Sequence, residues 1–404
     1  MRTLYTAIAV LGSILTVGAQ ECANGRYTSE VFNEVTVTTA ITFGSNTGVS
    51  GGNQTLRMDV YEPAGDALEE RPVILVAFGG SFIAGSRGDV AELCRSLARM
   101  GYVAVAPDYR VGFFFPNQTS TTRAVLRGAH DMKACVRYLR KSVAEMDNPY
   151  RIDEDRIIAG GVSAGAISAI HATYLNEESE TPAVLVSEIA SLGGLEGNSG
   201  NPGYSSAVLA CLSFSGAIGD TTWIQPGDVP MVSVHEVGDG VVPYYTQQVS
   251  VVGLPTGLVA SGSHDIHVRL NNLGVPNCFL SYPGNGHVGY LNTDAVNAIA
   301  YVALFSGELS CDLATTCGEL PTVVNDVDQA QPFMVYPNPT SGPVRVQMDE
   351  PGVLTVHDMS GREVLRKRVQ AGECSLDLSD LPSGVFVIRM EGRPHVWTRV
   401  VRAD

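Results

Sequence analysis

The sequence predicts an α/β fold, a mostly parallel sheet with helices on both faces, followed by a small all-β sandwich. Short apolar runs of strand length alternate with helix-like segments through most of the chain, as expected when parallel strands are buried on both faces. Hydrophobic residues make up 45% of the chain and charged residues 17%, so a large core can form. Residues 331–404 differ, because short β-like runs there are separated only by turn residues.

The predicted elements follow one another in a regular order. A β-rich segment covers residues 28–62. The apolar runs predicted as buried strands are Val73–Phe78, Val103–Ala106, Ile157–Ala159, Val208–Phe214, Met231–His235 and Cys278–Tyr282. The segments with helical spacing are 89–100, 123–146, 164–176, 264–273 and 293–306. Because long connections join most strands, we expect the strands to run mostly parallel.

Composition divides the chain into four predicted segments. They are a signal peptide at residues 1–19, an α/β domain at 20–317, a polar linker at 318–330 and a β-sandwich at 331–404. Arg2, an apolar stretch and small residues before Gln20 are typical of a signal peptide. The sandwich has nine basic and nine acidic residues, so the whole net charge of −16 lies before it.

The charge and the hydropathy exclude several partners. A net charge of −16 without a basic cluster is unfavourable for nucleic acid or for an anionic membrane surface. No apolar run after the signal peptide reaches the roughly 18 residues that a membrane span needs. No cysteine pair has zinc-ribbon spacing, and we expect neither a metal nor a cofactor.

The chain has eight cysteines, and export makes disulfides possible. Cys311 and Cys317 are close together at the edge of the linker, so we expect them to pair. Four others lie in apolar segments, where a buried small hydrophobic side chain is at least as good an interpretation: Cys94, Cys135, Cys211 and Cys278.

The strongest chemical signal is Gly161-Val162-Ser163-Ala164-Gly165, which follows a predicted strand and opens a predicted helix. In that context the pattern indicates a nucleophilic serine on a sharp turn, because the glycines leave room and the hydroxyl projects beyond the sheet. A plain glycine turn is the alternative. We therefore predict Ser163 as the nucleophile.

A serine hydroxyl needs a base, and the base needs an acid to orient it. Asp239 follows the strand that ends at His235, so we predict it as the acid; Glu236 and Asp220 are the alternatives. His287 ends the glycine-rich turn after the last predicted strand and is the predicted general base. The resulting chain order of serine, acid and histidine is that of a hydrolase sheet.

The oxyanion of a tetrahedral intermediate needs hydrogen-bond donors. We predict the backbone N–H of Ala164 as one donor. The others are predicted at Gly80 and Ser81, in the turn that follows the strand ending at Phe78. A plain glycine turn is again the alternative.

These motifs together resemble the hormone-sensitive-lipase and carboxylesterase branch of the α/β-hydrolases, and above all esterases that act on feruloyl and acetyl-xylan esters. MDVYEP, GGSFIAGSR, APDYRVG, HDMKACVRYLR, RIDEDRIIAGGVSAGA and GNGH carry the resemblance over about residues 55–305. It implies an acyl-enzyme mechanism. Two positions depart from the family pattern: Phe78 stands where the oxyanion loop usually has histidine, and Glu236 where glycine commonly follows the histidine of the acid loop.

The C-terminal segment resembles the type A sorting domain of the type IX secretion system. YPNPTSG, VHDMSGREV, LDLSDLPSGVFVIRM and the final VRAD carry this resemblance. It implies contact with the secretion machinery and a protein that is secreted from, or displayed on, a Gram-negative bacterium. A β-rich carbohydrate-binding or adhesive module is the alternative.

The sequence therefore predicts a secreted serine hydrolase of short-chain, aryl or carbohydrate esters, whether small or linked to a polymer. A serine peptidase of the same fold and a non-catalytic binding protein on a hydrolase fold are the alternatives. Phe82, Tyr109 and Phe113–Phe115 are candidates for lining an acyl pocket, with core packing equally compatible. The glycine-rich stretch 192–206 is a candidate loop near the site.

Overall fold

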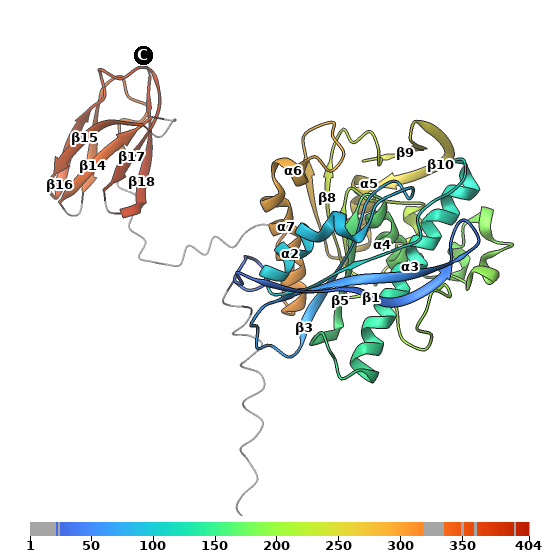
Figure 1. Cartoon of the computed structure of the whole chain (residues 1–404). Coiled ribbons are helices and arrows are strands. Elements are labelled where there is room, and N and C mark those ends of the chain that lie inside the picture. The colour runs from blue at the N-terminus through green and yellow to red at the C-terminus, as the bar shows by residue number, and fades with distance from the viewer. Residues whose placement is uncertain are drawn as a thin grey trace, which may run out of the picture. The chain divides into compact units, whose positions relative to one another are not determined.

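The computed structural model describes residues 22, 25–317, 335–348, 351–358, 362–391 and 393–403. The chain forms two compact units, one up to Leu320 and one from Pro321, and each is described by itself (Figure 1). The predicted signal peptide at residues 1–19 and the predicted linker at residues 318–330 lie outside the described residues. Within the described part of the chain, no helix is long and apolar enough to cross a membrane.

An eight-stranded sheet forms the centre of the first unit, in the order β1-β2-β4-β3-β5-β6-β8-β11. The bounds are β1 Val35–Thr47, β2 Asn53–Pro63, β3 Arg71–Ala77, β4 Val103–Pro107, β5 Ile152–Val162, β6 Ala210–Phe214, β8 Met231–Glu236 and β11 Asn277–Tyr282. The strands from β4 to β11 pair in parallel, whereas β1 and β2 add an antiparallel edge. All residues of β3, β4 and β6 are buried, which explains their continuous apolar sequence.

Helices cover both faces of this sheet, as predicted (Figure 1). Helix α2 (Ala91–Arg99) packs with α7 (Ala295–Ser310), and α3 (Gln118–Glu145) packs with α4 (Ala164–Tyr174). Helix α5 (Ser263–Leu273) lies against β11, and the short α6 (Tyr290–Thr293) precedes α7. Helix α3 begins five residues before its predicted start, because the Asn117 side chain accepts a hydrogen bond from the Ser120 amide and caps it.

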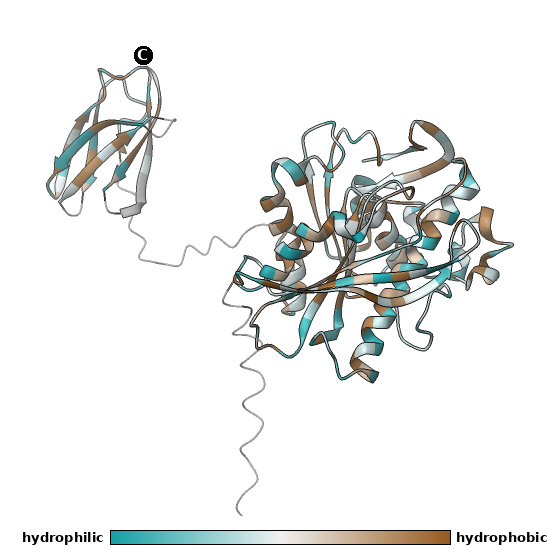
Figure 2. Cartoon of the chain, viewed as in Figure 1, coloured by the Kyte–Doolittle hydropathy of each residue, from teal (hydrophilic) through white to brown (hydrophobic). Residues whose placement is uncertain are grey.

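A separate three-stranded sheet, which was not predicted from the sequence, lies beside the main one. Its order is β7-β10-β9, with β7 at Ala217–Ile218, β9 at Thr246–Val251 and β10 at Leu254–Gly262. We call β9 and β10 the hairpin. Its outer residues include exposed hydrophobic side chains, and Figure 2 colours its curved end as hydrophobic.

The disulfide prediction was wrong. Cys311 pairs with Cys22, and Cys317 pairs with Cys278. Cys311 directly follows α7 and bonds to Cys22 near the N-terminus. Cys317 bonds to Cys278, the second residue of β11. Each of the two neighbouring cysteines therefore has a partner that is distant in sequence. The other three cysteines of apolar segments are free and buried: Cys94, Cys135 and Cys211.

The second unit is an all-β sandwich, as predicted. One antiparallel sheet has the order β12-β13-β16 and the other β15-β14-β17-β18. Their bounds are β12 Val335–Tyr336, β13 Pro343–Met348, β14 Gly352–His357, β15 Glu363–Val369, β16 Gly372–Asp377, β17 Gly384–Met390 and β18 Arg393–Arg402. In β13 every second residue is buried, so Val344, Val346 and Met348 enter the core while their neighbours face solvent.

Candidate active site

Ser163 occupies a strained turn between β5 and α4. Its backbone has φ 55° and ψ −119°, a conformation that a residue with a side chain rarely adopts. The flanking glycines are required by close backbone contacts: a Cβ on Gly161 would lie 2.4 Å from the Gly165 carbonyl carbon, and one on Gly165 would lie 2.1 Å from the Ala77 oxygen. Glycine is therefore required at both positions, because the neighbouring backbone leaves no room for a Cβ.

The side chains of Ser163, His287 and Asp239 form one chain of hydrogen bonds. His287 Nε2 lies 2.7 Å from Ser163 Oγ, and His287 Nδ1 lies 2.7 Å from Asp239 Oδ2. A carboxylate only accepts hydrogen bonds, so Nδ1–H donates to Asp239 and Nε2 of the neutral ring accepts from the serine hydroxyl. The arrangement can transfer a proton from the serine to the imidazole.

The Asp239 carboxylate is buried and fully engaged. Oδ1 accepts from the Val241 and Val242 amides at 2.8 and 3.0 Å, and Oδ2 lies 3.2 Å from His235 Nε2 in addition to its bond with His287. Burial by itself would raise the pKa of Asp239, but the hydrogen bonds from His235, His287 and the Val241 amide outweigh it and hold the pKa well below its ordinary value. The carboxylate is therefore ionised at neutral pH.

His235 connects this carboxylate to the core. It is the penultimate residue of β8, it is fully buried, and its Nδ1 lies 2.8 Å from the Ser263 hydroxyl at the start of α5. Since Ser263 can donate to Nδ1, Nε2 carries the hydrogen, and both Asp239 Oδ2 at 3.2 Å and the Val242 carbonyl at 3.3 Å can accept it. From the sequence, His235 was predicted only as the last residue of the strand before the acid.

Glu236 lies beneath the turn that carries His287. Its buried carboxylate is close to three glycines of that turn: a Cβ on Gly286 would lie 2.8 Å from Oε2, and one on Gly289 would lie 2.9 Å from Oε1. The Gly289 amide also donates to Oε2 at 3.4 Å. The unusual glutamate thus occupies space that these glycines leave open.

The alternative acids have other partners. Asp220 accepts a hydrogen bond from the Thr222 amide at 2.8 Å and caps a short 3₁₀ helix. No hydrogen bond among the described residues joins His287 to Asp220 or to Glu236. The geometry favours Asp239.

The loop after β3 passes directly over the serine. A Cβ on Gly79 would lie 3.2 Å from Ser163 Cβ, and the next residues turn through positive φ values of 123° at Gly80 and 55° at Ser81. Within the described part of the chain, the Gly80 and Ser81 amides donate to no protein acceptor, whereas the Gly80 oxygen accepts from Ile83 and Ala84. Ser81 and Ala164 both line the cavity beside Ser163.

Phe78 braces this loop without a polar side chain. Its buried ring stacks on Tyr109 with ring centroids 4.4 Å apart, and the Tyr109 hydroxyl donates to the Phe78 carbonyl at 2.8 Å. Burial raises the pKa of Tyr109, so the hydroxyl keeps its proton. This contact supplies a hydrogen bond to the loop backbone despite the departure from histidine.

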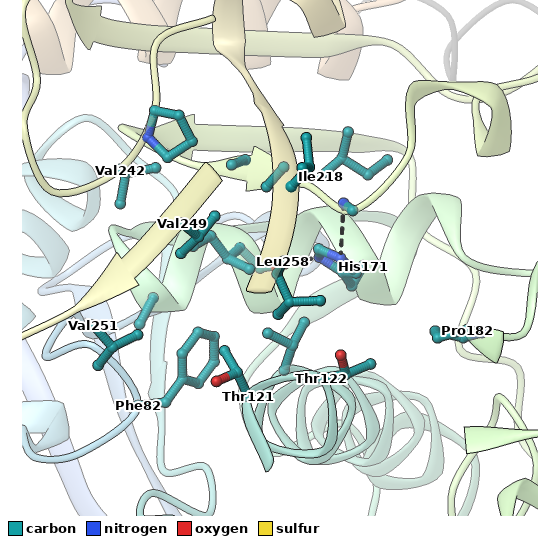
Figure 3. A pocket seen from close by; sticks show the side chains of 18 of the residues that line it. Phe82, Thr121, Thr122, His171, Pro182, Ile218, Val242, Val249, Val251 and Leu258 are labelled. Atoms are coloured by element: carbon teal, nitrogen blue, oxygen red, sulfur yellow. Dashed lines mark hydrogen bonds between the residues drawn. The ribbon is translucent and has the colours of Figure 1, made fainter. Parts of the chain in front are cut away.

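A largely apolar cavity of about 410 Å³ extends from Ser163 (Figure 3). It lies between α3, α4 and the hairpin. In Figure 3, Phe82 and Pro182 lie on opposite sides of it, and the side chains between them include Thr121, Thr122, His171, Val249 and Leu258. The contribution of the hairpin was not predicted from the sequence. Alternating apolar residues around Gly253 were a signal that could have revealed it.

Only part of the predicted pocket lines this cavity. Phe82 does, but Tyr109 is buried behind the loop, and Phe114 and Phe115 are 70% and 85% exposed. The stretch 192–206 packs elsewhere, against α3: Glu196 pairs with Lys133 and Arg137, and Ser199 donates to Asp131. Among the described residues, no group of three or more His, Cys, Asp and Glu is arranged to hold a metal ion.

Comparison with known proteins identifies two domains. Residues 58–218 match the family model BD-FAE, and residues 334–401 match that of the secretion system C-terminal sorting domain. The chain thus carries an esterase-type α/β-hydrolase, the class that the sequence resembles, with a secretion sorting domain after it. A search of curated proteins gives no match.

Solved structures of esterase 2 from Thermogutta terrifontis are among those similar to this chain. The form phosphorylated by paraoxon has a TM-score of 0.47 and 20% identity, and the alignment covers 68% of this chain and 93% of that one. The butyrate-bound form has a TM-score of 0.44 and 20% identity, with 64% and 92% covered.

Proposed function

We propose that the first unit hydrolyses carboxylic esters through an acyl-enzyme. The observation that carries the proposal is the continuous chain of hydrogen bonds from Asp239 through His287 to Ser163. His287 Nε2 takes the serine proton as Oγ attacks the ester carbonyl, and then gives that proton to the departing alcohol. Water repeats the sequence on the acyl-enzyme, releasing the acid and regenerating the serine.

Asp239 orients the imidazole and stabilises its protonated form. Because its pKa lies well below the ordinary value, the carboxylate keeps its charge while His287 gains one. The Ala164, Gly80 and Ser81 amides stabilise the oxyanion, and loss of one such donor costs about 3–4 kcal/mol in comparable enzymes. The substrates we propose are esters with an apolar acyl or aryl group, on a small alcohol, a carbohydrate or a polymer.

We further propose that the protein is exported from a Gram-negative bacterium. The signal peptide at residues 1–19 would direct it across the inner membrane, and the sorting domain would then engage the type IX machinery. The secreted protein would be released or retained at the cell surface.

The test compares hydrolysis of p-nitrophenyl butyrate by the full-length mature protein and its Ser163→Ala variant. We expect the variant to lose at least about 10⁵-fold in kcat. Ser191→Ala is the control, since that hydroxyl is exposed and bonds only to the Glu188 carbonyl among the described residues. Equal activity of Ser163→Ala and wild type would overturn the mechanism. Inactivity of wild type on every ester would favour a binding protein, and cleavage of peptides alone a peptidase.

A further inference from the structure

The cavity beside Ser163 is elongated along α4. Four residues of α4 and its C-cap line the cavity: Ala164, Ile167, His171 and Leu175. They are spaced three or four apart and therefore form one stripe of the helix. At a rise of 1.5 Å per residue, the stripe extends about 16 Å from Ala164 to Leu175. The cavity is thus much longer than an acetyl group.

Three other elements complete a channel around this stripe. The first turns of α3 contribute Gln118, Thr121, Thr122 and Val125. The hairpin contributes Val249, Val251 and Leu258, which are labelled in Figure 3. Pro182, Ala183 and Val184 also line it, and Figure 3 shows Pro182 on the side opposite Phe82, which we take as the far end. We call this space the acyl channel.

The imidazole that lines the channel has both ring nitrogens engaged by the protein. His171 Nδ1 lies 2.8 Å from the Ile167 carbonyl, and its Nε2 accepts from the Gly219 amide at 3.2 Å. Burial lowers the pKa of His171 to about 4, so the ring is neutral at pH 7 and has no remaining N–H for a ligand. A channel with such walls favours hydrocarbon over a charged or polyhydroxylated group.

We propose that this channel binds the acyl chain of medium- to long-chain esters. The proposal rests on the proposed ester hydrolysis and extends it beyond the short-chain substrates that the sequence suggests. An extended chain advances about 1.2 Å per bond, so the stripe accommodates about a dozen carbons. Each buried methylene contributes about fourfold to binding. An acetyl ester leaves most of the channel unused.

The first experiment measures kcat/KM of the full-length mature protein for p-nitrophenyl acetate, butyrate, octanoate and dodecanoate, each below its micellar concentration. We expect the dodecanoate value to exceed the acetate value at least tenfold. A decrease from acetate to octanoate would overturn the chain-length proposal while leaving ester hydrolysis intact. Absence of hydrolysis that depends on Ser163 would instead overturn the proposed function.

The second experiment blocks the far end of the channel. Val184→Trp should lower kcat/KM for dodecanoate at least tenfold and leave butyrate within twofold, because only the longer chain reaches that end. Val186→Trp is the matched control: this valine is 60% exposed, lies two residues away and does not line the cavity. Equal losses for both esters, or the same dodecanoate activity in both variants, would overturn the proposal.

A second pair of variants guards against misfolding at Val184. Leu258→Trp narrows the channel from the hairpin, whereas Val252→Trp changes the 78% exposed tip of the same hairpin. We expect a selective loss of dodecanoate hydrolysis in Leu258→Trp only. Thermal unfolding shows which variants are folded, and a folded Leu258→Trp with the wild-type length profile would contradict the proposal.

Discussion

The hydrogen-bonded residues around Asp239 and the apolar channel around α4 are built in opposite ways. In the first, two contacts of 2.7 Å and several backbone amides fix each polar atom. In the second, apolar side chains from α3, α4 and the hairpin enclose space with few directional contacts. The proposed chemistry therefore depends on a few exact positions, whereas the proposed selection of the acyl group is distributed over many side chains. Variants of the first region should affect all esters alike, and variants of the second should change the length profile.

After loss of the nucleophile itself, the largest expected effect comes from Asp239→Asn. The change removes the charge that stabilises protonated His287 and disturbs its tautomer, so kcat should fall about 10⁴-fold for butyrate and dodecanoate alike. Steady-state kinetics on both esters measure it. Asp228→Asn is the control, because that partly exposed carboxylate accepts from the Gln225 amide. A loss confined to dodecanoate would break the distinction between the two regions.

The same carboxylate makes folding stability depend on pH. Its pKa is lower in the folded protein than its ordinary value of 3.8, so its ionised form stabilises the fold above pH 3.8. That contribution is lost as the pH falls below 3.8 and through the folded pKa. The difference in unfolding free energy between wild type and Asp239→Asn should therefore shrink below pH 3.8, as urea unfolding can measure. A difference that grows on acidification would contradict the assigned charge.

Sequence could predict the hydrogen-bonded residues because each follows a strand of the parallel sheet. Ser163 comes directly after β5, Asp239 follows β8, and His287 follows β11. Carboxyl ends of parallel strands lie at one edge, and β8 pairs directly with β11, so the three loops meet there. Their proposed roles still await the kinetic tests.

The channel could not be predicted in the same way. Its walls come from segments far apart in sequence, and no motif marks their meeting. Val249 and Leu258 face the cavity only because β10 packs against α3, a tertiary contact that the local sequence pattern does not contain. The disulfides failed for a related reason, since proximity in sequence favoured Cys311 with Cys317 whereas the fold brings each to a distant partner.

Glu236 offers a smaller test within the hydrogen-bonded region. Glu236→Gly restores the residue common in the family but removes the side chain that packs under the His287 turn. We expect kcat to fall about tenfold with little change in KM, because small displacements of a catalytic group are costly. Glu236→Gln keeps the size and should recover most of the activity for both ester lengths. Full activity of the glycine variant would show that the turn needs no such support.

The smallest expected effect concerns Thr121 in the channel. Its hydroxyl is buried and has no hydrogen-bond partner within the described part of the chain, and Thr121 lines the cavity. An alkyl chain that covers this hydroxyl cannot satisfy it, and leaving it unpaired is unfavourable. Thr121→Val has nearly the same shape and should raise kcat/KM for dodecanoate severalfold, with acetate unchanged. Thr122→Val is the matched control, because the Thr122 hydroxyl donates to the Gln118 carbonyl at 2.7 Å. A decrease for dodecanoate in Thr121→Val would instead mean that the hydroxyl binds an oxygen of the natural acyl group, and it would limit the channel to oxygenated chains.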